Sequence, residues 1–399
     1  MPETPWLTII GVGEDGLEGL PPASRAALAS AEVVMGAARH LSLAPGLGAE
    51  RVVWPVPFAD GLPLLRGFSG RRVAVLASGD PFWFGLGSVI AREFRPGEWR
   101  ALPTPSTFSL AAARLGWPLE RTSCLGLHAA PLTRLRPHLA PGERLIVLLR
   151  DGAAVAGLAA YLCEQGFGTS RLWVMEALGG PRERVREARA DGALPPDCAH
   201  PVCIAMEIDG AGRALPRASG LDDSFFAHDG QITKRPVRAL ALSALAPRPG
   251  ELLWDIGGGS GSIAIEWLLR HPATQAVSIE AHAERAARIR ANAEQLGVDR
   301  LQVVQGVAPK ALEPLPSPQA VFIGGGLSEA LLDALEQRLA PGTRLVAHAV
   351  TLESEAVLAA AQARRGGTLL RIELASAGAL GERRGWKSAY PVVQWSVTL

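Results

Sequence analysis

The chain has 399 residues, too many for one compact domain and typical of two. Hydrophobic residues at 48% and charged residues at 20% exclude a disordered, collagen-like or coiled-coil protein. Forty basic and 39 acidic residues leave a formal net charge of +1, which argues against a protein built to bind nucleic acid. No apolar run reaches the roughly 18 residues of a membrane span, the start lacks the basic segment of a signal peptide, and the four cysteines form no CxxC pair. We therefore expect a cytoplasmic protein that neither contacts a membrane nor binds a metal.

A short segment without apolar periodicity divides the chain. Residues 209–220 (DGAGRALPRASG) combine Gly, Pro, Arg and Ser, a composition typical of linkers. We predict one domain over 1–208 and another over 221–399, both of ordinary size. The halves share no repeat beyond a glycine-rich turn, so we expect two different folds.

In the first half, short apolar runs alternate with helical stretches, as in the buried sheets of α/β domains. The pattern predicts strands at 7–12, 33–35, 72–77, 145–149, 172–176 and 202–206. It predicts helices at 23–29, 107–115 and 153–165.

The second half shows a clearer alternation. It predicts strands at 252–256, 276–280, 301–304, 320–323 and 344–349, with helices at 262–270, 283–296, 328–339 and 353–365. Two strand-like segments, 368–375 and 391–398, then follow as an antiparallel hairpin. This order predicts a doubly wound sheet with a reversed edge.

A glycine-rich turn after the strand 252–256 predicts a cofactor site. Its residues are Asp255, Gly257, Gly258, Gly259, Ser260 and Gly261, and the next strand ends in Glu280. Glycines let a ligand approach the backbone, and an acid at that strand end can accept both ribose hydroxyls of an adenosyl group. An NAD site would use similar residues, but Asp255 would repel a pyrophosphate and stabilise the cationic groups of S-adenosylmethionine (SAM). SAM is therefore the predicted ligand.

The loop after the strand 320–323 bears on what is methylated. Nitrogen methyltransferases often carry Asn/Asp-Pro-Pro-aromatic there, whereas this chain has Gly324, Gly325 and Gly326. Bare backbone leaves room for a large substrate and favours a carbon nucleophile that attacks the methyl group directly.

The first half holds a second set of turns. Gly11 and Gly13 follow the first strand, but Pro21 and Pro22 fall where a dinucleotide fold needs a helix. The segment 78–87 (SGDPFWFGLG) follows the strand 72–77, and hydroxyl-bearing Ser106 and Thr107 precede the next helix. Such clusters at successive strand ends predict a second ligand site.

These motifs carry a family resemblance over nearly the whole chain. The first half, with IIGVGEDG, MGAARHL, VAVLASGDPFWFG and TPSTFSLAAARLGWP, resembles the tetrapyrrole (corrin/porphyrin) methylases, most closely those of carbon 5. The second half, with HDGQITK, LLWDIGGGSGSIAIEW and VFIGGGL, resembles the decarboxylating methylases of carbon 15. Their fusion is similar to the precorrin-6Y C(5,15)-methyltransferases (decarboxylating) of cobalamin biosynthesis.

The resemblance implies a fold, a reaction and two SAM sites. It implies a tetrapyrrole methylase fold of two α/β subdomains, then a Rossmann-like class I SAM methyltransferase. A precorrin-6Y/6B-type substrate would gain methyl groups at carbons 5 and 15 and lose carbon dioxide from the ring C acetate, giving precorrin-8X. Matching positions assign the first SAM to Gly11, Gly13, Gly79, Asp80, Ser106 and Thr107, and the second to Thr233, Gly257, Gly258, Gly259, Ser260, Gly261, Glu280 and Ala308. Related enzymes are dimers or tetramers, so we expect a homo-oligomer.

Candidate residues for substrate contact or proton handling lie in and after the HDGQIT loop. They are His228, Lys234 and Arg235, and Arg238 is a further candidate for holding a substrate carboxylate. Each has a plain structural alternative, as a solvated charge or a loop histidine. Two other classes remain open: an NAD-linked oxidoreductase and an RNA methylase.

Overall fold

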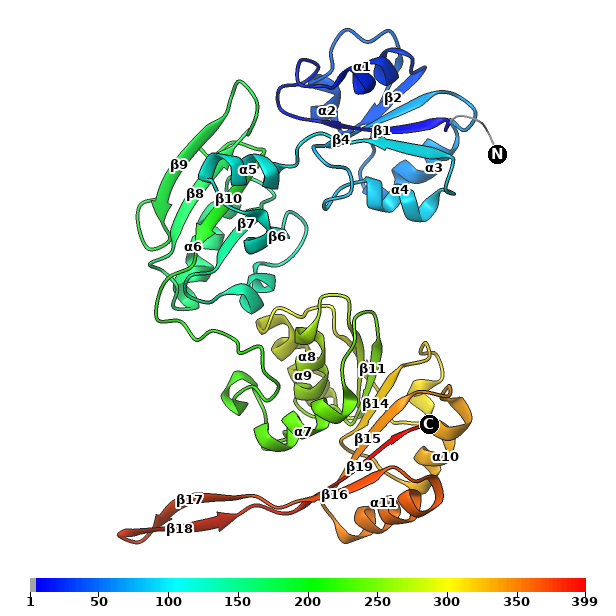
Figure 1. Cartoon of the computed structure of the whole chain (residues 1–399), viewed down its shortest axis with the longest axis vertical. Helices are drawn as coiled ribbons and strands as arrows, with labels where there is room; N and C mark the ends of the chain where they lie inside the picture. Colours follow the sequence, from blue (N-terminus) through cyan, green and yellow to red (C-terminus); the bar gives the residue numbers. More distant parts are fainter. Residues whose placement is uncertain (1–4) are drawn as a thin grey trace. The chain divides into compact units, whose positions relative to one another are not determined.

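The computed structural model describes residues 5–399, which form two compact units (Figure 1). Unit 1 comprises the described residues up to Pro131 together with His138–Arg213, and unit 2 comprises Leu132–Pro137 and Ala214–Leu399. The change from one unit to the other at Arg213 and Ala214 falls inside the segment predicted as a linker.

The first sheet of unit 1 is parallel, with strand order β3-β2-β4-β1-β5. Its strands are β1 (Leu7–Val12), β2 (Val33–Gly36), β3 (Glu50–Val53), β4 (Val73–Ser78) and β5 (Trp99–Leu102). Its helices are α1 (Pro22–Ala29), α2 (Ala38–Ser42), α3 (Gly61–Arg66) and α4 (Gly87–Glu93). Successive residues of a strand pack into two different hydrophobic clusters, as Ile9 and Ile10 of β1 do. Burial on both faces explains the unbroken apolar runs.

The second sheet of unit 1 is mixed, with order β6-β7-β10-β8-β9. Its strands are β6 (Ser123–Gly126), β7 (Arg144–Leu148), β8 (Arg171–Glu176), β9 (Arg184–Arg189) and β10 (Val202–Glu207), and its helices are α5 (Thr107–Leu115) and α6 (Ala154–Glu164). The Ser106 hydroxyl caps α5 by accepting from Ser109 N at 3.1 Å, and α5 ends at Gly116 in the left-handed region.

Unit 2 has one seven-stranded sheet with order β13-β12-β11-β14-β15-β19-β16. Its strands are β11 (Leu252–Ile256), β12 (Gln275–Glu280), β13 (Gln302–Gln305), β14 (Ala320–Ile323), β15 (Arg344–Ala349), β16 (Thr368–Ile372) and β19 (Val392–Thr398). Its helices are α7 (Arg235–Leu245), α8 (Ser262–Arg270), α9 (Ala283–Gln295), α10 (Glu329–Arg338) and α11 (Leu352–Arg365). The strands from β13 to β15 are parallel, and β19 is antiparallel to both neighbours, which confirms the doubly wound sheet with a reversed edge.

A two-stranded ribbon of unit 2 was not predicted. Between β16 and β19 the chain forms the ribbon of β17 (Ala375–Leu380) and β18 (Arg383–Ser388), which projects from the sheet in Figure 1. Its sequences, ASAGAL and RRGWKS, are mostly exposed and have no apolar face that would mark a strand packed on a core.

None of the helices in residues 5–399 has the length and apolar character needed to cross a bilayer.

Candidate functional site

A cavity of about 570 Å³ lies in unit 1 at the carboxyl ends of β1, β2 and β4. Five residues predicted to bind the first SAM line it: Gly13, Gly79, Asp80, Ser106 and Thr107. The ends of β7 and β8 close another side, with Leu148 and Met175. The structure thus brings the predicted turns together at the sheet edge where α/β proteins bind ligands.

Gly11 does not line the cavity, but close packing of the backbone explains why a glycine is needed at this position. A Cβ there would lie 1.8 Å from the carbonyl oxygen of Gly79. Gly79 has a φ of +50°, and its own Cβ would lie 3.0 Å from Ser106 Cα. Gly11 therefore lets the turns close on each other and supports the cavity from behind.

The polar side chains predicted for the first SAM partly hold their own turns. Asp80 Oδ1 accepts from Phe82 N at 2.9 Å, and Ser106 Oγ is the cap of α5. Beside them, aromatic side chains form an exposed rim: Phe58, Trp83 and Phe84 are 46%, 37% and 51% exposed. The cavity therefore offers backbone and polar groups at one place and apolar ring faces at another.

A polar cluster on the cavity wall was not predicted from the sequence. Arg39 NH2 lies 2.8 Å from both His40 Nε2 and Ser78 Oγ, and these two atoms are 2.8 Å apart. Arg39 NH1 also forms an ion pair with Glu14. All four residues line the cavity, together with His200.

Both histidines of this wall are held neutral. Burial and the neighbouring charge of Arg39 lower the pKa of His40 to about 4. The same two causes lower the pKa of His200. A signal for this cluster was present in the sequence, because MGAARHL follows β2 just as SGD follows β4.

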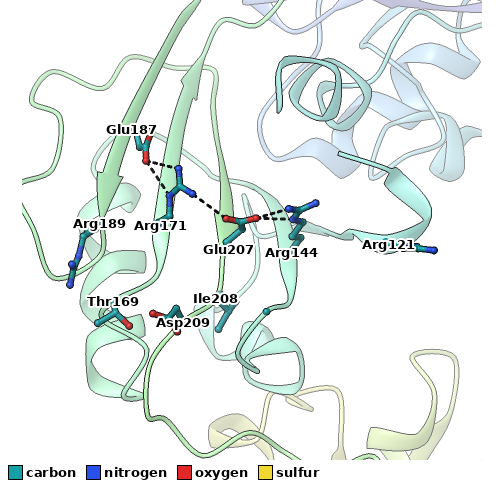
Figure 2. A pocket seen from close by; sticks show the side chains of 10 residues that line it. Arg121, Arg144, Thr169, Arg171, Glu187, Arg189, Glu207, Ile208 and Asp209 are labelled. Atoms are coloured by element: carbon teal, nitrogen blue, oxygen red, sulfur yellow. Dashed lines mark hydrogen bonds and ion pairs between the residues drawn. The ribbon is translucent and has the colours of Figure 1, made fainter. Parts of the chain in front are cut away.

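A wider groove of about 760 Å³ elsewhere in unit 1 has arginines whose charges are largely paired (Figure 2). Arg144 donates twice to Glu207, at 2.9 and 2.7 Å, and Arg171 donates twice to Glu187, at 3.2 and 2.9 Å. Arg144 and Arg171 begin β7 and β8, at the opposite strand ends from the cavity. We interpret this groove as a solvated face of ion pairs.

In unit 2 the glycine turn joins β11 to α8, and most of its glycines are required by packing. A Cβ at Gly257 would lie 2.6 Å from Gly325 N, one at Gly258 2.1 Å from Ser278 Oγ, and one at Gly261 2.7 Å from Ile289 Cγ2. Gly259 differs, because its nearest neighbour would be the carbonyl oxygen of Gln231 at 3.3 Å. The backbone at Gly259 is therefore the part of the turn that a ligand can approach.

The two acids predicted for this site have different surroundings. Glu280 accepts from Gly259 N at 2.9 Å and from His282 N at 3.0 Å, so it touches the turn directly. Asp255 is buried, and its Oδ2 accepts from Ser278 Oγ at 3.2 Å. Burial raises the pKa of Asp255 to about 7. Asp255 thus lies beneath the turn, and Glu280 lies beside it.

The HDGQIT loop lies over this turn and is fixed to α9. Asp229 accepts from Arg285 at 2.9 Å and pairs with Arg288 at 3.0 Å. Buried Asn292 donates to the carbonyls of Ala227 at 3.0 Å and Ser260 at 2.9 Å, joining the loop to the turn.

The predicted catalytic residues lie in this loop and at its end, and all three are exposed. His228 Nδ1 accepts from Gly230 N at 3.1 Å, Lys234 Nζ is 3.9 Å from Asp223 Oδ2, and the backbone N of Arg235 donates to Asp223 Oδ1 at 3.1 Å. Their side chains remain accessible. Among the remaining predicted residues, Thr233 and Ala308 are half-buried, and Ser260 is buried in the turn.

The interpretation of Arg238 as a carboxylate clamp for substrate is wrong. Arg238 is fully buried and donates to Glu266 at 2.6 Å, to Asp223 at 3.0 Å, and to the carbonyls of Thr233 and Leu221. Glu266, also fully buried, accepts from Gly220 N at 2.7 Å and Leu221 N at 2.8 Å. The ion pair of Arg238 and Glu266 therefore has a structural role, because its hydrogen bonds hold both ends of the segment 220–233.

Comparisons with known proteins cover both units. Residues 6–193 match the family model of tetrapyrrole (corrin/porphyrin) methylases, and residues 224–399 match that of the precorrin methyltransferase domain. A protein of Sinorhizobium sp named precorrin-6Y C(5,15)-methyltransferase (decarboxylating) is 52% identical over 99% of this chain and 97% of its own. The chain belongs to the precorrin-6Y C(5,15)-methyltransferase (decarboxylating) family. A second member, from Mycobacterium tuberculosis (strain CDC 1551 / Oshkosh), is 42% identical over 98% of this chain and 99% of its own.

Membership in the precorrin-6Y C(5,15)-methyltransferase family confirms the family resemblance seen in the sequence and the use of SAM. A crystal structure of the C-terminal domain of such an enzyme from Rhodobacter capsulatus is 55% identical, covers 46% of this chain and 100% of its own, and has a TM-score of 0.45.

Proposed function

We propose that this chain methylates a precorrin-6Y-type macrocycle at carbons 5 and 15 and removes carbon dioxide from its ring C acetate, giving precorrin-8X. Unit 1 acts at carbon 5 and unit 2 at carbon 15, each with its own SAM. The observation that carries the proposal is the pair of ligand-accessible glycine turns, one per unit, in a chain 52% identical to a named enzyme of this activity over its length.

The cavity of unit 1 fits SAM and part of a macrocycle. Its volume of about 570 Å³ lies within the roughly 300–1,000 Å³ of small-molecule sites. Gly13, Gly79, Asp80, Ser106 and Thr107 would hold the cofactor, with Gly11 behind them. The exposed rings of Trp83 and Phe84 offer a surface for a flat, apolar macrocycle.

The glycine turn of unit 2 is suited to binding SAM because two acidic side chains lie next to backbone that carries no side chains. Glu280 retains free lone pairs for ribose hydroxyls after accepting two backbone N–H groups. Asp255 beneath the turn provides an acid near the cationic end of the cofactor. Thr233, Ser260 and Ala308 complete the proposed site.

Bound SAM supplies an electrophilic methyl group, and the protein aligns a nucleophilic carbon with it. For the decarboxylation, the bond to the carboxyl carbon breaks, its electron pair enters the conjugated macrocycle, and a proton from water completes the methyl group. The protein therefore needs no dedicated base and only disfavours the charged carboxylate by burial. His228, Lys234 and Arg235 then contact substrate without being essential for proton transfer. Loss of turnover in His228→Ala, with SAM and substrate binding intact, would contradict this picture.

We also propose a cytoplasmic homo-oligomer. The four cysteines are free thiols, which fits a reducing compartment. The β17–β18 ribbon exposes Leu380, Trp386 and nearby Tyr390 by 70%, 78% and 89%. A two-stranded ribbon is marginally stable alone in water, so a second copy of the chain is the proposed partner for it.

Incubation with precorrin-6Y and SAM carrying a deuterated methyl group tests the function. Mass spectrometry of the product should show two labelled methyl groups and the loss of one carbon dioxide. A product with one methyl group, or with two and no loss of carbon dioxide, would contradict the bifunctional assignment.

A further inference from the structure

The polar cluster of unit 1 has more positive charge than its own carboxylate neutralises. Glu14 is 7% exposed and pairs with two arginines, Arg39 through Oε1 and Arg182 through Oε2, the latter at 2.9 Å. His40 and His200 add no charge at neutral pH. Two guanidinium groups therefore share one carboxylate, which leaves the cluster with an excess of one positive charge.

Of the two arginines that pair with Glu14, Arg39 is the one that a ligand in the cavity can contact. It lines the cavity and its side chain is 27% exposed, whereas Arg182 is 60% exposed and is not among the lining residues. A guanidinium has five N–H donors, and the contacts of Arg39 to Glu14, His40 and Ser78 involve only NH1 and NH2. Within residues 5–399, the Nε–H group donates in none of these contacts and is the donor that we assign to the ligand.

The neighbours of Arg39 fix its orientation. Arginine only donates, so His40 Nε2 accepts from it, and the neutral ring is the form that can do so. Glu14 follows β1, Arg39 and His40 lie on α2 after β2, and Ser78 ends β4, so three strand ends hold one guanidinium. A guanidinium held in this way presents its charge and Nε–H in a fixed direction to a carboxylate oxygen.

The other charged residue lining the cavity, Asp80, lies in the turn assigned to SAM, whose cationic groups suit an acid. The remaining wall carries apolar Phe58 and Trp83. The cavity therefore combines an apolar surface with one oriented cation, which suits a broad ring that bears carboxylate side chains.

We propose that Arg39 binds a side-chain carboxylate of the macrocycle in unit 1, with Glu14, His40 and Ser78 as positioning residues. This inference rests on the proposed function. It predicts that Arg39 determines the affinity for the macrocycle and not the affinity for SAM.

The test uses the full chain with the substitutions Arg39→Gln and Arg39→Lys, and Arg182→Gln as the matched control. The control removes the other arginine bound to Glu14 without changing the cavity lining. Carbon 5 methylation is measured by mass spectrometry over a range of precorrin-6Y concentrations at saturating SAM, and SAM binding is measured by calorimetry.

Arg39→Gln should raise the KM for the macrocycle roughly 10- to 100-fold, with a much smaller change in kcat. Arg39→Lys should recover part of the loss, because it keeps the charge but not the fixed direction of the Nε–H donor. Arg182→Gln should raise this KM much less than Arg39→Gln, because it removes the shared positive charge but leaves Arg39 in the cavity lining. SAM affinity should stay constant in all three variants.

An unchanged KM for the macrocycle in both Arg39 variants would overturn the inference, as would an equal weakening of SAM binding, which would assign Arg39 to the cofactor. If the unaltered chain methylates no precorrin-6Y, the proposed function itself fails. Constant SAM binding also shows that the variants fold.

Discussion

The buried pair of Arg238 and Glu266 gives the sharpest prediction about the stability of unit 2. Both side chains are fully buried and lie 2.6 Å apart. Glu266→Gln would leave the guanidinium buried without its carboxylate, and breaking such a pair costs about 3–5 kcal/mol. Arg238 keeps Asp223 and two backbone carbonyls as acceptors, so we expect the lower end, about 3 kcal/mol.

Urea unfolding of the full chain, followed by tryptophan fluorescence, measures this loss, because Trp254 and Trp267 are fully buried in unit 2. The matched control in the same unit is Glu373→Gln, which breaks the exposed pair of Glu373 and Arg371, 67% and 54% exposed. The control should lose less than about 1 kcal/mol. Because the pair holds both ends of the segment 220–233, Glu266→Gln should also weaken SAM binding in unit 2.

The double substitution Arg238→Met with Glu266→Leu should recover most of the stability, since an apolar pair leaves no unpaired charge. A loss below about 1 kcal/mol for Glu266→Gln, equal to that of the exposed control, would refute the reasoning.

Three further predictions concern unit 2. Burial raises the pKa of Asp255 to about 7, so the free energy of unfolding should fall by about 4 kcal/mol as the pH rises from about 4 to 7. Asp255→Asn should flatten this dependence of the urea midpoint on pH across the same range. An unchanged pH dependence would exclude this carboxyl as its cause. Gly259→Ala should weaken SAM binding measured by calorimetry, because an added Cβ would lie 3.3 Å from Gln231 O, between the HDGQIT loop and the turn of the proposed SAM site. Gly46→Ala, with a similar φ of +73° and open space around its Cβ, should not weaken it. Equal effects would place the ligand elsewhere. Replacing residues 375–388 by a short glycine linker should give a monomer in sedimentation velocity with SAM binding retained, and an unchanged oligomer would show that the ribbon is not the contact.

The strands with unbroken apolar runs were predictable, because burial on both faces of the sheet favours an apolar residue at nearly every position of the strand. β1, β11 and β14 lie within one residue of their predicted bounds. Exposed strands such as β9, with RVREAR, were missed because most of their residues are exposed and form no apolar face. The β17–β18 ribbon was missed because its residues are also mostly exposed, although β17 has no charged residue.

The candidate sites were predictable where they depend on glycine and not where they depend on long-range contacts. The turns at Gly79 and Gly259 follow strands directly, so their positions could be inferred. The ion pair of Glu14 with Arg39 joins residues 25 apart, and the burial of Arg238 depends on Glu266, 28 residues away. Neither the partner nor the burial of these arginines can be inferred from local pattern.

Calorimetric titration of the full chain with SAM shows whether each unit holds its own SAM. We expect two SAM per chain, falling to one in Gly79→Val, whose Cβ would lie 2.8 Å from Pro105 O, and to one in Glu280→Ala. No SAM should bind when both substitutions are combined. A single SAM per chain in the unaltered protein, or the loss of both in either variant alone, would contradict this expectation.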